Sequence, residues 1–558
     1  MTDTLAIALA QINPTVGDID GNVGRILSAR AEAAGQGAEL VIAGELCVSG
    51  YPPEDLVLKR AFLKVIETAV DKLAGVTADG GPGLLIGAPW RDGGRSRGLD
   101  RGNDDERLYN ATLLLDGGDI TAIRFKHELP NYGVFDEKRI FTPGPLPGPV
   151  AFRGVRLGVM ICEDMWTPDV AECLVESGAE ILVVINGSPF ETDKPDDRLS
   201  PAVARVTETG LPLAYVNLIG GQDELVFDGA SFVLGADKKY KAKAAAWKED
   251  LLTTFWKRDR DAWTCDETPI PPGIAEEEAI YQAMVLGLRD YVGKNGFPGV
   301  LIGLSGGIDS ALSAAVAVDA LGPERVHLVA MPSPFTSDES IEDAEEISRL
   351  LGCRLDSIAI NPAMDAFDDM LAEIFTGHTP DTTEENIQAR ARGMTLMALS
   401  NKFGYMVLST GNKSEMSVGY ATLYGDMCGG YSVLKDVYKT MVFQLCRWRN
   451  ASKDGAVMPD RVITKPPSAE LKPDQTDQDT LPPYDELDAI LTCLIEHEMS
   501  LDDIAAKGHD IETAEKVWHM LDQAEYKRRQ GPPGVKITRR AFGRDRRYPL
   551  TNRFTGKV

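Results

Sequence analysis

Two series of short apolar segments, each alternating with helix-like stretches, constrain the possible fold of this chain more than any other feature. The segments are rich in β-branched residues and end at glycine, proline or polar turns, which predicts strands. The predicted strands are 5–12, 38–44, 83–89, 108–115, 155–161, 179–186 and 211–218, then 299–305, 326–332, 353–360 and 405–410. Several strands of the first series follow one another directly, whereas helical stretches separate those of the second. The pattern therefore predicts an α/β protein, with mixed sheets first and a doubly wound parallel sheet second.

The proline-rich segment 264–275 divides the two series. Its sequence, TCDETPIPPGIA, has the turn-forming composition of a linker, and 558 residues are too many for one core. We therefore predict a first domain at 1–263 and a second at 276–558, which opens with a helix that starts in acidic residues and ends near Gly296. In the first domain, Ser200 and Pro201 predict a helix start as cap and first helical residue.

Composition excludes several classes of protein. A formal charge of −27 argues against nucleic acid as the main ligand, because a polyphosphate backbone needs a basic surface. No apolar stretch is long enough to span a membrane, and no secretory signal is visible, so we expect a cytoplasmic protein. The eight cysteines form no CxxC pair and are expected to be reduced thiols, and the absence of HExxH argues against zinc.

The C-terminal tail, KITRRAFGRDRRYPLTNRFTGKV, is basic within this acidic chain. We expect it to dock on an acidic surface of its own subunit or of a partner subunit. A phosphate-contacting role is the alternative.

The sequence GLSGGIDS at 303–310 leaves a predicted strand and enters a predicted helix. Gly306 and Gly307 let the backbone turn tightly and approach a ligand, while the helix start offers free amides to an anion. Asp309 would be repelled by a bound phosphate unless a cation lay between them. The motif therefore predicts a phosphate loop that works with Mg²⁺.

This loop resembles the pyrophosphate loop of the N-type ATP pyrophosphatases, because SGGIDS is neither a Walker A motif nor GxGxxG. Further stretches resemble the NAD synthetases among them: ENIQARARG (385–393), STGNKSE (409–415), YGDMCGGYSVLKDVYKT (424–440), PSAELKPDQTDQDTLPPYDELD (467–488) and EYKRRQGPPGVKITRRAFGRDRRYP (525–549). The resemblance implies a Rossmann-like ATP pyrophosphatase domain that uses ATP and deamido-NAD.

The NAD synthetase resemblance also implies binding residues. ATP is expected to contact Gly303, Leu304, Ser305, Gly306, Gly307, Ile308, Asp309, Ser310, Thr410 and Lys435. Deamido-NAD is expected to contact Asn386, Arg390, Glu415 and Lys527, and Mg²⁺ is expected at Asp309 and Glu415.

In the first domain, Glu45, Lys126 and Cys162 each follow the end of a predicted strand, which would gather them at one sheet edge. A thiol needs a base or a nearby cation to act as a nucleophile at neutral pH. Glu45 can accept the thiol proton, and Lys126 can stabilise the negative charge that develops during attack. The three residues are chemically complete for amide hydrolysis through a thioester, although an isolated buried cysteine is more often only a small apolar side chain.

The segments around these residues resemble the nitrilase superfamily: GELCVSGYPPEDL (44–56), KHELPNYGVFDEKRIF (126–141) and GVMICEDMW (158–166). The resemblance covers roughly residues 1–260 and implies an αββα sandwich with Glu45, Lys126 and Cys162 as its catalytic residues. In glutamine-using members it implies glutamine contacts at Tyr132, Ser188 and Lys194. The family usually has glycine before that lysine, whereas this chain has Asp193.

Together the resemblances imply a glutaminase that supplies ammonia to an adenylating synthetase acting on deamido-NAD. The alternative is another glutamine-dependent amidotransferase of the same superfamily with a different acid substrate. A tRNA-thiolating enzyme is disfavoured by the acidic charge, and a non-catalytic scaffold by the presence of all three catalytic residue types. A homo-oligomer is expected because synthetase domains of this family pair with a copy of themselves.

Overall fold

The computed structural model describes residues 3–92, 107–192, 194–260, 262–452, 455–473, 475–552 and 554, with the side chains of 194–196 outside the description. It forms two compact units, Met1–Gly273 and Ile274–Val558. Their boundary lies inside the predicted linker 264–275. The start of that linker is wrong, because Thr264 and Cys265 belong to strand β15 (Ala262–Cys265) and pair with β14 (Asp250–Asp259).

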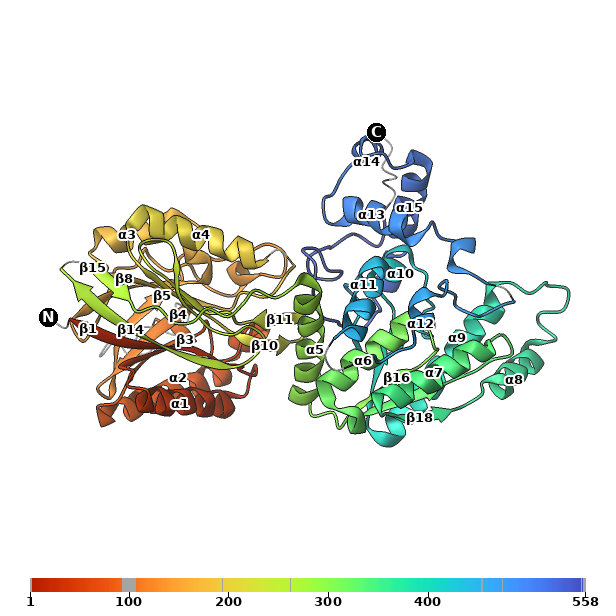
Figure 1. Cartoon of the computed structure of the whole chain (residues 1–558), viewed down its shortest axis with the longest axis horizontal. Helices are drawn as coiled ribbons and strands as arrows, with labels where there is room; N and C mark the ends of the chain where they lie inside the picture. The colour runs from red at the N-terminus through yellow and green to blue at the C-terminus, as the bar shows by residue number, and fades with distance from the viewer. Residues whose placement is uncertain are drawn as a thin grey trace. The chain divides into compact units, whose positions relative to one another are not determined.

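The first unit has two large sheets between two layers of helices, and a separate two-stranded sheet. One sheet has the strand order β15-β14-β1-β2-β3-β4-β5 and the other β13-β12-β9-β8-β7-β6. Figure 1 shows α1 and α2 on one side of the strands and α3 and α4 on the other. Leu9, Ile42 and Ile161 belong to the buried core between the sheets. The predicted αββα sandwich is confirmed.

The seven strands predicted for this unit are present, with ends that agree to within two residues, and the unit also contains strands that were not predicted. Its helices and strands are numbered in chain order. They are β1 (Thr4–Gln11), α1 (Ile19–Gly35), β2 (Leu40–Ala43), α2 (Arg60–Val76), β3 (Gly83–Arg91), β4 (Leu108–Asp116), β5 (Asp119–Phe125), β6 (Val150–Phe152), β7 (Val155–Ile161), α3 (Pro168–Glu176), β8 (Ile181–Asn186), α4 (Lys194–Thr209), β9 (Leu213–Asn217), β10 (Ile219–Gln222), β11 (Leu225–Asp228), β12 (Phe232–Leu234) and β13 (Tyr240–Lys243).

The predicted helix start at Ser200 and Pro201 is wrong. Helix α4 begins at Lys194, and Pro201 lies inside it. Arg198, in the turn before the proline, is buried and forms an ion pair with Asp228 at 2.6 Å. This tertiary contact stabilises helical turns that the local proline signal would have excluded.

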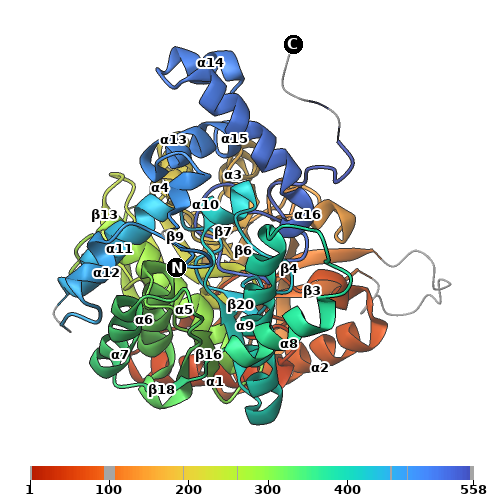
Figure 2. The same ribbon diagram turned by 90° about the vertical axis from the view of Figure 1, so that its right-hand side faces the viewer.

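The second unit contains a parallel sheet with the strand order β18-β17-β16-β19-β20. Figure 2 shows α6 and α7 on one side of β16 and α9 on the other. Leu301, Val329 and Val407 of the strands pack with Ala391 and Leu396 of α9. The order of the strands along the sheet reverses between the parallel neighbours β16 and β19. Their carboxyl ends therefore flank the crevice where doubly wound sheets bind ligands. The predicted doubly wound sheet is confirmed.

The elements of this unit are α5 (Glu276–Lys294), β16 (Val300–Gly303), α6 (Ile308–Leu321), β17 (Val326–Ala330), α7 (Asp338–Leu351), β18 (Arg354–Ser357), α8 (Asn361–Leu371), α9 (Thr382–Phe403), β19 (Met406–Ser409), α10 (Lys413–Val418), β20 (Tyr431–Ser432), α11 (Lys439–Asn450), α12 (Asp460–Thr464), α13 (Tyr484–Ile495), α14 (Leu501–Ala506), α15 (Ile511–Gln523) and α16 (Glu525–Arg528). Among the described residues, no helix is both long and apolar enough to cross a membrane.

The basic tail docks on acidic groups of its own subunit. Asp436 accepts hydrogen bonds from the backbone amides of Ile537 and Thr538, both at 2.7 Å. Buried Lys413 donates to Thr538 Oγ1 at 2.6 Å and to Glu496 at 2.7 Å. The tail therefore completes the packing around the loop that leads into α10.

Candidate active sites

The first site forms where strand ends of the two sandwich sheets meet. Glu45 follows β2, Lys126 follows β5, and Cys162 follows β7. The backbone amide of Gly187, just after β8, donates to Glu45 Oε2 at 3.0 Å and so joins the two sheets at this edge. The strand ends thus bring together the three residues that the sequence places at separate strand termini.

The ammonium group of Lys126 lies between two buried carboxylates. Its Nζ is 2.7 Å from Glu45 Oε1 and 2.9 Å from Glu137 Oε2, and the Lys126 side chain is 0% exposed. Burial opposes the charge, yet Glu137 and Glu45 together hold the pKa of Lys126 well above its ordinary value. Burial, with Glu45 nearby, raises the pKa of Glu137 to about 7 although Lys126 opposes the shift. A fixed positive charge is therefore available beside the thiol.

Cys162 stands on a strained turn. Its backbone has φ +47°, a left-handed conformation that costs a side-chain-bearing residue on the order of 1–3 kcal/mol. Burial and the neighbouring Glu45 raise the pKa of the Cys162 thiol well above its ordinary value, although Lys126 opposes the shift. The resting thiol is therefore protonated and needs a base when it attacks, a role that Glu45 can fill.

Sequence reasoning missed Glu137, which completes this charge cluster. The residue lies within the quoted motif 126–141, where the acidic pair Asp136–Glu137 gave no sign of which member turns inward. In the structure, Tyr51 donates from its hydroxyl to Glu137 Oε1 at 3.1 Å, and Asn110 Nδ2 donates to Glu45 Oε1 at 2.7 Å. These contacts fix both carboxylates around Lys126.

The predicted glutamine contacts lie around the same strand ends. Tyr132 is 51% exposed and donates from its hydroxyl to Glu163, the residue after Cys162, at 3.0 Å. Ser188 is buried, and its Oγ accepts from Arg198 Nε at 3.1 Å. The side chain of Lys194 lies outside the described residues.

The second site is a cavity of about 320 Å³ in the second unit, at the carboxyl ends of β16 and β19. Gly306 has φ +76°, and a Cβ there would lie 2.2 Å from the backbone oxygen of Ser340, so only glycine lets the loop lie against α7. The predicted residues that line the cavity are Gly303, Leu304, Ser305, Gly307, Ile308, Asp309, Ser310, Thr410 and Glu415.

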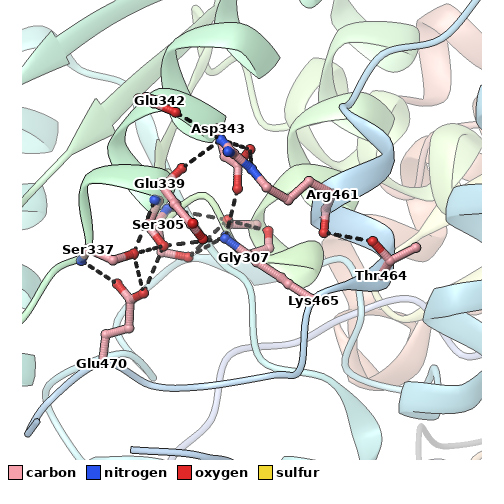
Figure 3. Close-up of polar contacts among 12 residues, drawn as sticks. Ser305, Gly307, Ser337, Glu339, Glu342, Asp343, Arg461, Thr464, Lys465 and Glu470 are labelled. Atoms are coloured by element: carbon pink, nitrogen blue, oxygen red, sulfur yellow. Dashed lines mark hydrogen bonds and ion pairs between the residues drawn. The ribbon is translucent and has the colours of Figure 1, made fainter. Parts of the chain in front are cut away.

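The segment 461–471 forms a wall of this cavity and is fastened to α7 at both ends (Figure 3). Asp343, which is 1% exposed, pairs with Arg461 and Lys465, both at 2.9 Å. Glu470 accepts from the hydroxyl groups of Ser337 and Ser340, both at 2.8 Å. The segment 461–471 therefore encloses the cavity on the side of α7, next to the phosphate loop.

Lys439 lies between the two predicted magnesium ligands. Its ammonium group hydrogen-bonds to Asp309 Oδ2 and is 3.3 Å from Glu415 Oε1, and Lys439 is 2% exposed. Burial raises the pKa of Glu415 to about 8; Lys439 opposes this shift and Asp309 adds to it. Asp309 and Glu415 thus share one buried ammonium group, that of Lys439.

The described residues contain no group of three or more His, Cys, Asp or Glu side chains that could hold a metal by themselves.

Sequence reasoning named Lys435 rather than Lys439. Lys435 is 8% exposed and is not among the residues that line the cavity. Both lysines lie in the same quoted motif, four residues apart, so local sequence gave no reason to prefer the second. Helix α11 begins at Lys439 and turns its side chain toward Asp309.

The remaining predicted dinucleotide contacts gather around the segment 419–423. Asn386 Oδ1 accepts from Thr422 Oγ1 at 2.8 Å, and Arg390 Nε donates to the Leu423 carbonyl at 3.3 Å. Lys527 donates to the carbonyls of Gly419 and Ala421, both at 2.7 Å. None of the three lines the cavity as described, whereas Tyr420 from the same segment does.

Comparisons with known proteins agree with both units. A carbon–nitrogen hydrolase model matches residues 6–260, and an NAD synthase model matches residues 280–531. The chain is 48% identical to a glutamine-dependent NAD(+) synthetase from Rhodobacter capsulatus, and the match covers 99% of each chain. A solved glutamine-dependent NAD+ synthetase from Acinetobacter baumannii, in complex with ADP, is 43% identical and covers 98% of each chain with a TM-score of 0.78.

A further solved structure, a glutamine-dependent NAD(+) synthetase from Cytophaga hutchinsonii, shares the fold with a TM-score of 0.82 at 21% identity. The fold and the two sites thus define a carbon–nitrogen hydrolase joined to an adenylating ligase. The chain belongs to the glutamine-dependent NAD(+) synthetase family.

Proposed function

We propose that this chain converts deamido-NAD, ATP and glutamine into NAD, AMP, pyrophosphate and glutamate. Relatives 40–48% identical over almost the whole chain carry the name glutamine-dependent NAD(+) synthetase. This similarity favours deamido-NAD over the alternative of a different acid substrate.

In the first site, Glu45 accepts the thiol proton as the Cys162 sulfur attacks the side-chain amide carbon of glutamine. Lys126 stabilises the oxyanion, a type of contact worth roughly 10²–10³ in rate. Ammonia leaves with the proton returned by Glu45, and water then hydrolyses the thioester to glutamate. Tyr132, Ser188 and Lys194 orient the glutamine.

In the second site, the phosphate loop and Thr410 hold ATP while the nicotinate carboxylate attacks the α-phosphorus and pyrophosphate leaves. Asp309 and Glu415 would hold Mg²⁺, which neutralises charge on the triphosphate when bound. Lys439 adds a second positive charge beside these carboxylates. Ammonia then attacks the acyl-adenylate, an amide bond forms, and AMP departs.

One observation supports the two-site proposal above all. A buried thiol with its base and fixed cation lies in one unit, and a phosphate-loop cavity lies in the other. Free ammonia is mostly ammonium at neutral pH and is then not a nucleophile. A ligase that needs ammonia therefore gains from a source that shields it from water.

The test supplies purified protein with ATP, Mg²⁺, deamido-NAD and glutamine and quantifies the products. We expect NAD and AMP in equal amounts, and we expect EDTA to abolish both while leaving glutamine hydrolysis at Cys162 intact. If deamido-NAD stays unchanged with either glutamine or ammonium salts, the proposed substrate is wrong.

We also propose that the chain acts as a homo-oligomer in the cytoplasm, where its thiols stay reduced. Seven large apolar side chains are exposed on α8, α9 and the turn after α8, two helices that contact each other, and we propose that they form the self-association patch. Its members are Phe367, Met370, Ile374, Phe375, Met394, Met397 and Phe403.

Self-association through this patch predicts that Ile374→Glu combined with Met394→Glu lowers the molar mass measured by size exclusion with light scattering. Both side chains are 72% exposed, so the charges are tolerated in an isolated subunit. Leu58→Glu, in the first unit at 57% exposure, serves as the control and should leave the mass unchanged. A parent protein that is itself monomeric would contradict the proposal.

A further inference from the structure

Asp164 is a buried carboxylate that takes no part in the proposed chemistry. It lies two residues after Cys162 in the short helical turn η4 (Cys162–Met165), and it is 1% exposed. A buried charge of this kind is costly unless hydrogen bonds satisfy it. Its partners therefore indicate why the residue is there.

Within the part of the chain that the structure describes, the hydrogen bonds to the Asp164 side chain come from backbone amides beside catalytic residues. Asp164 Oδ1 accepts from His127 N at 2.9 Å and from Glu128 N at 2.8 Å, the two amides that follow Lys126. Asp164 Oδ2 accepts from Ile161 N at 3.0 Å, the amide that precedes Cys162. One carboxylate thus joins the lysine segment to the cysteine turn.

We propose that Asp164 is a positioning residue for the glutaminase reaction. By binding the backbone beside Lys126 and beside Cys162, it fixes the position of the Lys126 ammonium group relative to the Cys162 thiol. This inference rests on the proposed reaction at Cys162.

The simpler interpretation is that Asp164 only caps its own turn. The bond to Ile161 satisfies that interpretation, because it spans three residues. The bonds to His127 and Glu128 span 37 and 36 residues, and a local cap has no need of them. The left-handed conformation of Cys162 is strained, so the turn requires anchoring from outside itself.

The geometry also explains why a carboxylate is needed. Three N–H donors point at two acceptor oxygens, and an asparagine would offer only one oxygen and place an NH₂ group against a third donor. Asp164→Asn keeps the shape of the side chain but loses the hydrogen bonds either to the lysine segment or to the cysteine turn. We expect the distance between Lys126 and Cys162 to loosen, which lowers the rate of chemistry more than the affinity for glutamine.

The experiment compares Asp164→Asn with the parent and with Asp250→Asn, a matched control. Asp250 lies in the same unit and accepts a hydrogen bond from the backbone amide of Ala245 at 2.9 Å, away from the catalytic segments. We expect Asp164→Asn to lower kcat for glutamine hydrolysis about 10²-fold with KM changed less than about threefold. Alkylation of Cys162 by iodoacetamide should slow in parallel, and Asp250→Asn should match the parent in both measurements.

Folding of the site is checked separately in the Cys162→Ala background. Adding Asp164→Asn there should leave glutamine binding, measured by calorimetry, within about threefold of Cys162→Ala alone. Loss of glutamine binding would overturn the proposal, because Asp164 would then support the whole fold of the site. Hydrolysis by Asp164→Asn at the parental rate would overturn it as well. If the parent protein does not hydrolyse glutamine, the proposed glutaminase reaction itself is wrong.

Discussion

Replacing Cys162 with alanine is expected to abolish glutamine-driven NAD formation while ammonia-driven formation continues. The thiol is the group that bonds to the substrate carbon, and removal of a nucleophile typically lowers kcat on the order of 10³-fold or more. The phosphate-loop cavity consists entirely of residues from the second unit, and the substitution does not touch it. With ammonium chloride as donor, the rate should therefore stay within about twofold of the parent.

The measurement follows NAD formation with each nitrogen donor in turn and, separately, glutamate release from glutamine. Cys173→Ala is the matched control, because Cys173 lies in α3 of the same unit and outside the site. It should retain both activities. Loss of ammonia-driven synthesis in Cys162→Ala would contradict a division of the reaction between two sites.

Replacing Lys439 with methionine is expected to produce the opposite pattern. Without the ammonium group, Asp309 and Glu415 lose the buried positive charge of Lys439 that now pairs with both. The pKa of Glu415, already about 8 through burial, then rises further, because Lys439 lowers it. We expect NAD formation from either donor to fall roughly 10²–10³-fold, whereas glutamine hydrolysis at Cys162 continues.

Lys435→Met is the control that separates the two lysines of this motif. It makes the same chemical change four residues earlier, at a side chain outside the cavity lining. We expect Lys435→Met to lower the rate of NAD formation, and to change the KM for ATP, less than Lys439→Met does. Lys439→Arg and a thermal melt establish that the charge, and not a loss of folding, accounts for the result. If Lys435→Met lowers the rate of NAD formation more than Lys439→Met does, the result would instead support the ATP contact predicted at Lys435.

The sequence by itself determined the fold class and predicted the chemistry of both sites. Strand-terminal positions suggested a shared sheet edge, and the resemblance of the surrounding segments to the nitrilase superfamily made Glu45, Lys126 and Cys162 the predicted catalytic residues. The strand–glycine–helix motif at 303–310 specified the phosphate loop in the same way, because tight turns and free helix amides are local properties. Tight turns and helix starts depend on neighbouring residues, so a local sequence pattern is enough to predict them.

The tertiary structure decided which polar side chains turn inward. Glu137 adjoins Asp136, and Lys439 lies four residues after Lys435. In each case only contacts with residues distant in the chain show which member of the pair belongs to the site. The same holds for the start of α4, where a buried ion pair outweighs a proline, and for Asp164, whose partners lie 36 and 37 residues away. A buried charge needs partners that are often distant in sequence, and the local sequence does not show which residues these partners are.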